Sequence, residues 1–243
     1  MRIKIMNQRI KEILENFEKM QIGLDDTFRF RCTMCGKCCR NRDDILLNPF
    51  DLYRLAKGLG IAPEEVVNKY CDVYIGDSSR FPIIRLNSVG VDKRCPFLEG
   101  NRCSVHHNKP TVCALFPLGR CVKYEPGNRK LSDKTEYILQ PITCGDKKEN
   151  HTVREWLEQS HIPVDDEFFG VWHSVLAELS MTIQEMEKVL KEKHLLMVWN
   201  VIFAGLYLKY DTKQEFQPQF EANAKSVKEL VQEVEALIKE KSQ

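Results

Sequence analysis

The sequence lacks a long apolar run, a secretory leader pattern and an internal repeat. Its longest apolar stretch, residues 195–208, is interrupted by Asn200 and is shorter than the roughly 20 residues that span a bilayer. The first nine residues carry charges every few positions and contain no apolar core of a signal peptide. We therefore expect no membrane segment, a buried helix over residues 195–208, and a cytoplasmic location.

The sequence also lacks an excess of charge of either sign. It has 36 Lys and Arg against 35 Asp and Glu, a formal net charge of +1, so we expect no nucleic-acid partner. We find no P-loop, no Ser/His/Asp arrangement and no His-Glu-x-x-His motif, and no catalytic residue can be named. One local exception lies between residues 29 and 42, which hold five basic residues and no acidic one: Arg29, Arg31, Lys37, Arg40 and Arg42. They are either ordinary surface charge or cations that stabilise neighbouring thiolates.

What the sequence does have is clustered cysteine. Ten cysteines without an export signal favour metal binding or redox chemistry over structural disulfides. Nine are predicted metal ligands: Cys32, Cys35, Cys38, Cys39, Cys95, Cys103, Cys113, Cys121 and Cys144. Cys71 lies at the end of a predicted helix among apolar residues, and we interpret it as a small buried side chain.

The spacing of the first four cysteines leaves the number of centres open. Cys32, Cys35 and Cys38 match the first three ligands of a bacterial ferredoxin, but the fourth position is missing and Cys39 follows directly. Adjacent side chains point in different directions, so Cys38 and Cys39 either serve two sites or include one non-ligand. Two four-thiolate sites use eight cysteines and leave one for hydrogen bonding or reaction. Zinc and iron–sulfur clusters both accept this ligand set.

Periodicity and capping signals predict a helix-dominated α+β protein. In it, a loop-rich, cysteine-ligated metal domain with a few short strands packs with a helical C-terminal region. The predicted domains are an N-terminal helix (1–27), the metal domain (28–157) and the helical region (158–243). We expect helices over 1–24, 49–57 and 63–70, strands over 28–32, 45–47, 81–86 and 137–139, and loops over 94–121. A capping box opens a helix at Thr152, and an apolar seam, packed within the chain, follows in the last helix: Phe220, Ala224, Val227, Val231, Val234 and Ile238.

Three ordered motifs are similar to those of a known family. They are Cys32-x-x-Cys35-x-x-Cys38-Cys39, Arg94-Cys95-Pro-Phe-Leu98, and a stretch from Cys103 through His106 and Pro110 to Cys113 and Pro117. Over about residues 28–157 the chain resembles the YkgJ-type CxxCxxCC cysteine-cluster proteins, which are described as zinc- or iron-chelating. The resemblance implies a cysteine-bound metal centre of the iron–sulfur kind. The family includes a flagellin lysine methylase, so its chemistry differs between members.

The leading hypothesis is a protein with one or two 4Fe–4S clusters that acts in redox chemistry or in cluster-dependent modification of a protein or small molecule. The alternatives are a non-enzymatic zinc protein, in which metal staples a loop-rich interaction module, and an electron carrier or metal-handling protein. A protein substrate or a redox partner is expected. The only Gly-x-Gly, Gly58 to Gly60, lies between two predicted helices, so the sequence gives no support for S-adenosylmethionine. His106 is either a ligand, a donor to a thiolate, or an ordinary loop residue.

Overall fold

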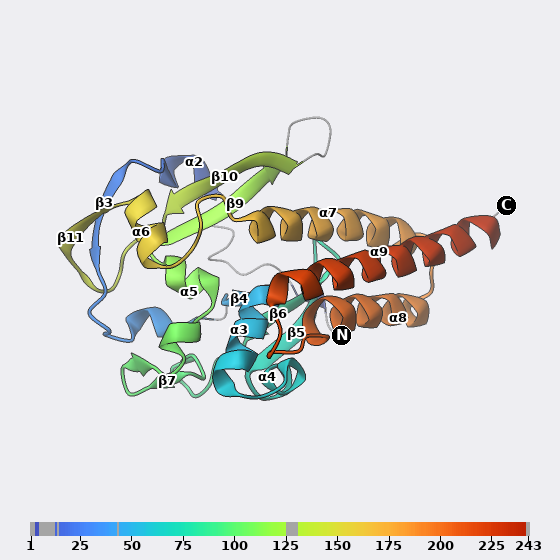
Figure 1. Ribbon diagram of the computed structural model, residues 1–243, viewed down its shortest axis with the longest axis horizontal. Helices are drawn as coiled ribbons and strands as arrows, with labels where there is room; N and C mark the ends of the chain where they lie inside the picture. Colours follow the sequence, from blue (N-terminus) through green and yellow to red (C-terminus); the bar gives the residue numbers. More distant parts are fainter. Residues whose placement is uncertain (1–2, 5–12, 14, 43, 125–130, 242–243) are drawn as a thin grey trace. The chain divides into compact units, whose positions relative to one another are not determined.

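The computed structural model describes the chain except residues 1–2, 5–12, 14, 43, 125–130 and 242–243 (Figure 1). The fold is α+β and dominated by helices, as predicted. The chain divides into two compact units. Unit 1 comprises residues 1–6, 46–85 and 174–243, and unit 2 comprises residues 7–45 and 86–173. No helix in the described ranges is long and apolar enough to cross a membrane.

Unit 1 contains a four-stranded sheet in the order β1-β5-β6-β4. Its strands are β1 (Ile3–Lys4), β4 (Leu46–Leu47), β5 (Cys71–Gly76) and β6 (Pro82–Leu86). Strand β1 runs parallel to β5, with Ile3 opposite Ile75, and β4 runs antiparallel to β6, with Leu47 opposite Ile84. Cys71 is buried at the start of β5, which raises its pKa to about 12, so the interpretation as a small buried side chain is confirmed.

Two helices of unit 1 begin and end at signals that the sequence displays. Helix α3 (Pro49–Leu59) starts with a capping box between Asn48 and Asp51, and Gly60 ends it in a left-handed conformation with φ 67°. Helix α4 (Pro63–Tyr70) begins at a proline followed by two glutamates. The Gly58 to Gly60 stretch is therefore the end of a helix and not a loop that follows a strand.

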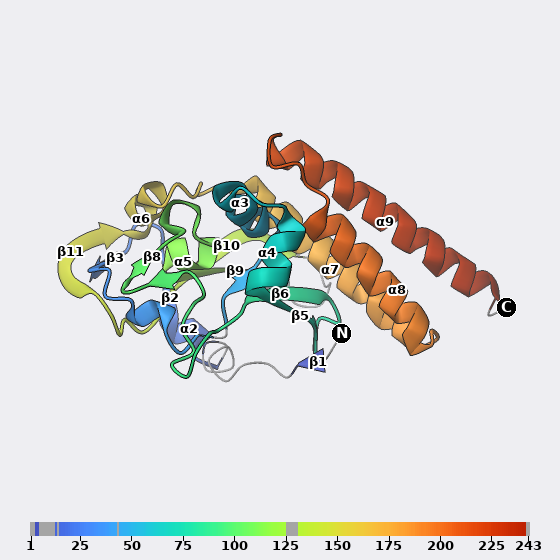
Figure 2. The ribbon, with the colours of Figure 1, turned by 90° about the horizontal axis from the view of Figure 1, so that it is seen from below.

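The rest of unit 1 is helical. Helices α8 (Glu192–Phe203) and α9 (Phe216–Lys241) lie beside the second half of α7 (Glu167–Glu187) in both views (Figures 1 and 2), and the π-helical turn η3 (Ala204–Leu208) extends α8. The expected helix over residues 195–208 is confirmed, with one exposed face that includes Met197. Packing of the α9 seam within the chain is confirmed for its first half, where Val227 lies against Gly205 of η3.

Unit 2 combines three small sheets with short helices. Strands β2 (Gln21–Ile22), β9 (Leu118–Tyr124) and β10 (Leu131–Leu139) form one sheet, β3 (Thr27–Arg31) pairs with β11 (Asp146–Thr152), and β7 (Leu98–Glu99) pairs with β8 (Arg102–Cys103). Its helices are α2 (Phe17–Met20), α5 (Thr111–Leu115), α6 (Val153–Gln159) and the 3-10 turns η1 (Lys37–Cys39) and η2 (His106–Asn108). Phe28, Phe30, Leu115, Leu118 and Leu157 form the centre of its core.

Helix α6 closes this core over α5. Its start is the predicted capping box, in which Thr152 accepts a hydrogen bond from the backbone N–H of Glu155 at 3.1 Å. Trp156 Nε1 donates to the carbonyl oxygen of Leu115 at 3.0 Å, and the Ser160 hydroxyl donates to that of Ala114 at 3.2 Å. Both bonds satisfy carbonyl groups at the end of α5, a helix too short to be stable alone.

The predictions fail where pairing between distant strands decides the structure. The helix expected over residues 1–24 lies partly outside the described residues, and within them Ile3–Lys4 and Gln21–Ile22 are strands that pair with β5 and β10. Strands β5, β7, β8, β9 and β11 were not predicted, and neither was helix α5, which lies in the stretch 94–121 that was expected to be loop. The sequence of β11, Asp-Lys-Lys-Glu-Asn-His-Thr, has little β propensity, and its conformation depends on pairing with β3.

The contact between η3 and α9 can be tested at Gly205. A Cβ atom at this position lies 2.3 Å from Cγ2 of Val227, so Gly205→Ala is expected to destabilise the protein by about 1–3 kcal/mol, measured by urea unfolding. Gly170→Ala is the matched control, because a Cβ there meets nothing within 4 Å. Val227→Ala in the Gly205→Ala background is expected to recover part of the loss. Equal stability of the two glycine variants contradicts the close packing.

Candidate metal centre

The nine clustered cysteines all belong to unit 2, whereas Cys71 belongs to unit 1. None of the ten, all of which lie in the described ranges, forms a disulfide. Cys32 is exposed, and the other eight of the cluster are partly buried. Four of them lie in the eight residues 32–39 that follow β3, here called the octet. The others lie in the region from Cys95 to Cys113, on strand β9 (Cys121), and in the segment before β11 (Cys144).

The octet turns sharply after β3. Gly36 has φ 70° and precedes η1, which carries Cys38 and Cys39. Their Sγ atoms lie 3.8 Å apart, so the side chains are closer than adjacency in sequence led us to expect. A hydrogen bond from the Cys39 thiol lowers the pKa of Cys38 to about 6, against the effect of burial. The pKa of Cys39 is raised in turn by this bond, by burial and by the Cys38 thiolate.

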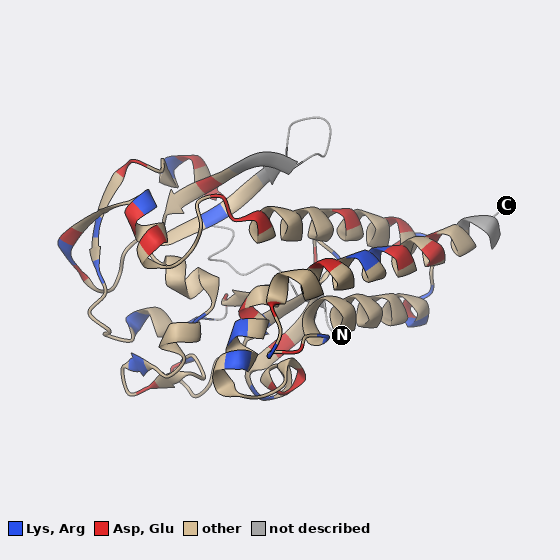
Figure 3. Ribbon diagram, in the orientation of Figure 1, with Lys and Arg blue, Asp and Glu red and all other residues tan. Residues whose placement is uncertain are grey.

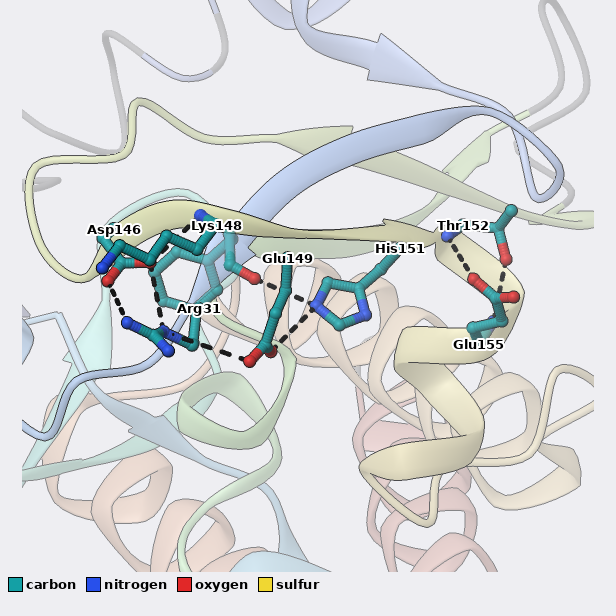
Figure 4. A network of polar contacts seen from close by, with 8 residues as sticks. Arg31, Asp146, Lys148, Glu149, His151, Thr152 and Glu155 are labelled. Carbon is teal, nitrogen blue, oxygen red and sulfur yellow. Dashed lines mark hydrogen bonds and ion pairs between the residues drawn. The ribbon is translucent and has the colours of Figure 1, made fainter.

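The pairing of β3 with β11 brings Cys144 to the octet. Asp146 lies opposite Arg31, and the Arg31 guanidinium donates to both carboxylate oxygens of Asp146, at 2.5 and 3.2 Å (Figure 4). This pair lowers the pKa of Asp146 and gives the strand end a defined geometry. A second contact between the two strands joins His151 Nε2 to the carbonyl oxygen of Phe30, 3.0 Å away. Cys32 and Cys144 flank this pairing.

Gly145 allows the close approach. It has φ 68°, and a Cβ atom at this position lies 2.4 Å from the carbonyl oxygen of Arg31 and 2.6 Å from the ring of Phe30. Its backbone N–H donates to the Cys35 sulfur and is the largest cause of the lowered pKa of that thiol. Cys144 itself has its pKa raised to about 12 by burial and then by the thiolates of Cys38, Cys35 and Cys32.

A second approach joins the octet to the region around Cys95. The backbone N–H of Cys95 donates to the carbonyl oxygen of Cys39 at 2.8 Å. The β7–β8 hairpin then places Cys103 opposite Leu98, and Leu98 N–H donates to the Cys95 carbonyl oxygen at 3.1 Å. Cys113 lies on α5, and its thiolate charge acts on Cys39, as does that of Cys95.

Three of these cysteines share one turn geometry. Cys35, Cys95 and Cys103 each accept a hydrogen bond at sulfur from the backbone N–H two residues later in the chain, namely Lys37, Phe97 and Val105. Burial raises the pKa of Cys95 and Cys103, and these N–H groups partly oppose it. Backbone donors aimed at sulfur stabilise thiolates and tune the potential of metal centres that thiolates hold.

Most of the predicted cations are engaged with carboxylates. Figure 3 shows basic residues on β3 and both signs on β11; Arg31 pairs with Asp146, and Arg40 with Asp92. Arg42 pairs with Asp44, and its side chain is only 10% exposed. Its charge favours the thiolate forms of Cys38 and Cys95, and Lys109 acts in the same way on Cys103.

Two further candidates are His106 and Cys121. His106 is largely exposed in η2 and lies edge to face with His107. Partial desolvation of its ring and the charges of Lys109 and His107 lower its pKa. This favours the interpretation as a loop residue. Cys121 lies on β9, opposite Glu136 of β10.

The donor set fits a metal that prefers sulfur. Half-buried thiols from separate stretches of chain raise one another's pKa values, and a cation that replaces their protons relieves both burial and repulsion. In the described part of the chain, no three His, Cys, Asp or Glu side chains already stand in a metal-binding arrangement. The backbone brings the thiols together, and their side chains have to turn toward the metal. Sequence reasoning missed Gly145 and overlooked Arg42 as the most buried of the five cations, although a glycine directly after the last cysteine was a visible signal.

Gly145→Ala is expected to lower stability by about 1–3 kcal/mol more than Gly100→Ala, and to lower the metal content of the purified protein. Gly100 is the matched control, because its φ is 59° and a Cβ there meets nothing within 4 Å. It carries the same strain of a left-handed backbone without the clash. Chemical denaturation and metal analysis check the two effects. Equal metal content in both variants contradicts the role of the Gly145 approach.

Comparison with known proteins supports the metal-binding assignment. Residues 31–156, just over half of the chain, match the CxxCxxCC family, which is described as a "Putative zinc- or iron-chelating domain". The match covers all nine clustered cysteines and confirms the resemblance seen in the sequence. No curated protein and no solved structure matches the chain. The chain therefore belongs to the CxxCxxCC family of zinc- or iron-chelating cysteine-cluster domains.

Proposed function

We propose that unit 2 binds iron as one or two iron–sulfur clusters of the 4Fe–4S type. The candidate ligands are Cys32, Cys35, Cys38, Cys39, Cys95, Cys103, Cys113, Cys121 and Cys144. The observation that carries this proposal is the mutual repulsion of the thiolates, since Cys144 is acted on by three cysteines more than a hundred residues away in sequence. An iron–sulfur core bound by thiolates removes the protons and supplies compensating positive charge.

Two features support iron over zinc. The Cys-x-x-Cys-x-x-Cys spacing of Cys32, Cys35 and Cys38 is that of ferredoxins. The backbone N–H groups aimed at the sulfurs of Cys35, Cys95 and Cys103 are of the kind that set cluster potentials. A bound cluster supplies one-electron chemistry, and these donors and Arg42 would stabilise its thiolate ligands. We therefore propose a role in redox chemistry or in cluster-dependent modification of a protein partner.

Zinc is the second candidate, and one observation favours it. The hairpin of β7 and β8 has only two residues in each strand, so it contributes little stability of its own. A structural zinc site would supply folding free energy there and make the unit a metal-stapled binding module.

The metal content of anaerobically purified protein from iron-replete cells separates the two. We expect a brown protein with broad absorption near roughly 400 nm and equal amounts of iron and acid-labile sulfide. Cys35→Ser is expected to lose at least half of both. Cys71→Ala is the control, because Cys71 lies in unit 1, and it should retain them. A colourless protein with stoichiometric zinc would sink the iron–sulfur proposal.

Lysine methyl transfer is one specific modification to test, because the family that the sequence resembles includes a flagellin lysine methylase. Its test is a gain of methyl mass on a protein from a cell extract, dependent on S-adenosylmethionine and abolished by Cys35→Ser. We expect Gly60→Ala not to affect the gain, because Gly60 ends helix α3. Methylation that persists in the Cys35→Ser variant contradicts a cluster-dependent reaction.

A further inference from the structure

We propose that the cysteines of unit 2 form two adjacent four-thiolate centres that meet at the neighbouring residues Cys38 and Cys39. The first consists of Cys32, Cys35, Cys38 and Cys144, and the second of Cys39, Cys95, Cys103 and Cys113. This inference rests on the proposed thiolate metal binding but not on the identity of the metal.

The first centre is built by the β3–β11 pair. Arg31 lies opposite Asp146, so the residues that follow β3 and those that precede β11 are neighbours. The Gly145 N–H donates to the Cys35 sulfur, and Gly145 lies against the Arg31 carbonyl group. The thiolates that act on Cys144 are those of Cys38, Cys35 and Cys32, which are the three cysteines with ferredoxin-like spacing. Cys144 therefore takes the fourth position that this spacing lacks.

The second centre is built by contacts on the other side of η1. The Cys95 N–H donates to the Cys39 carbonyl oxygen at 2.8 Å, which holds these two backbones together. The β7–β8 register and the bond from Ser104 N–H to the Phe97 carbonyl oxygen, 2.9 Å, bring Cys103 back to Cys95, and their charges interact. Cys113 on α5 completes the group through its interaction with Cys39.

The two groups meet at the Cys38–Cys39 pair. Their Sγ atoms lie 3.8 Å apart, at the junction of the two groups. Cys38 shares a side-chain hydrogen bond with Cys144, and its charge also reaches Cys95 and Cys103. Cys39 is acted on by Cys113 and Cys95, and its backbone carbonyl group holds the Cys95 N–H. Ligands that are consecutive in sequence would place the two centres next to each other.

The test compares metal per chain in the anaerobically purified wild type, Cys144→Ser, Cys113→Ser and the double variant. We expect each single variant to lose about half of the bound metal, from a different centre, and the double variant to lose nearly all of it. Cys71→Ala, outside unit 2, should lose none. Loss of all metal in either single variant, with circular dichroism unchanged, overturns the division and indicates one shared centre.

A second measurement uses the wild-type chain, so it does not depend on the variants folding. A chelator removes the metal slowly while iodoacetamide traps released thiols, and mass spectrometry identifies them. We expect release in two sets, Cys32, Cys35, Cys38 and Cys144 in one and Cys39, Cys95, Cys103 and Cys113 in the other. Simultaneous release of all eight, or sets that mix these members, overturns the division. Two sets in a zinc-loaded protein would support the division while contradicting the iron–sulfur proposal.

Discussion

Crowding of thiols is the constraint on which unit 2 depends. The hydrogen bond with Cys38, burial and neighbouring thiolates raise the pKa of Cys39, and burial and neighbouring thiolates raise the pKa values of Cys95 and Cys144. Backbone N–H groups and the half-buried charges of Arg42 and Lys109 lower the pKa values of neighbouring thiols and so oppose part of this increase. The strand pair, the small hairpin and helix α5 bring cysteines from separate stretches of the chain to the octet.

Local signals predicted the elements whose ends are encoded within a few residues. Helices α3 and α6 begin at the expected caps, because an Asn or Thr side chain satisfies backbone N–H groups one turn away, and α4 begins at the expected proline. Strands β5, β9 and β11 were missed, because their hydrogen-bond partners lie elsewhere in the chain. The polar sequence of β11 becomes a strand only because β3 presents Phe28 and Phe30 to the core and Arg31 to Asp146.

The presence of a metal-binding cysteine cluster was predictable from spacing, but the contacts between its cysteines were not. Cysteines at short intervals indicate metal binding, and the match to a zinc- or iron-chelating family agrees with this prediction. Which thiol faces which depends on the register of β3 with β11 and of β7 with β8, and on a glycine that permits contact with the Arg31 carbonyl group. The short separation of the Cys38 and Cys39 sulfur atoms was also unexpected. It depends on the 3-10 turn η1, which follows Gly36 and contains both cysteines.

The pairing of Arg31 with Asp146 joins residues 115 positions apart, and this separation has a consequence for synthesis. Strand β3 leaves the ribosome long before β11 exists, and at about 5–20 residues per second the interval is roughly 6 to 23 seconds. Throughout that interval Cys144 has not yet been synthesised. For most of the interval the β7–β8 hairpin is missing as well. The nascent chain thus displays four neighbouring thiols to the cell before its fold can enclose them, so delivery of metal and protection from oxidation have to be timed to translation.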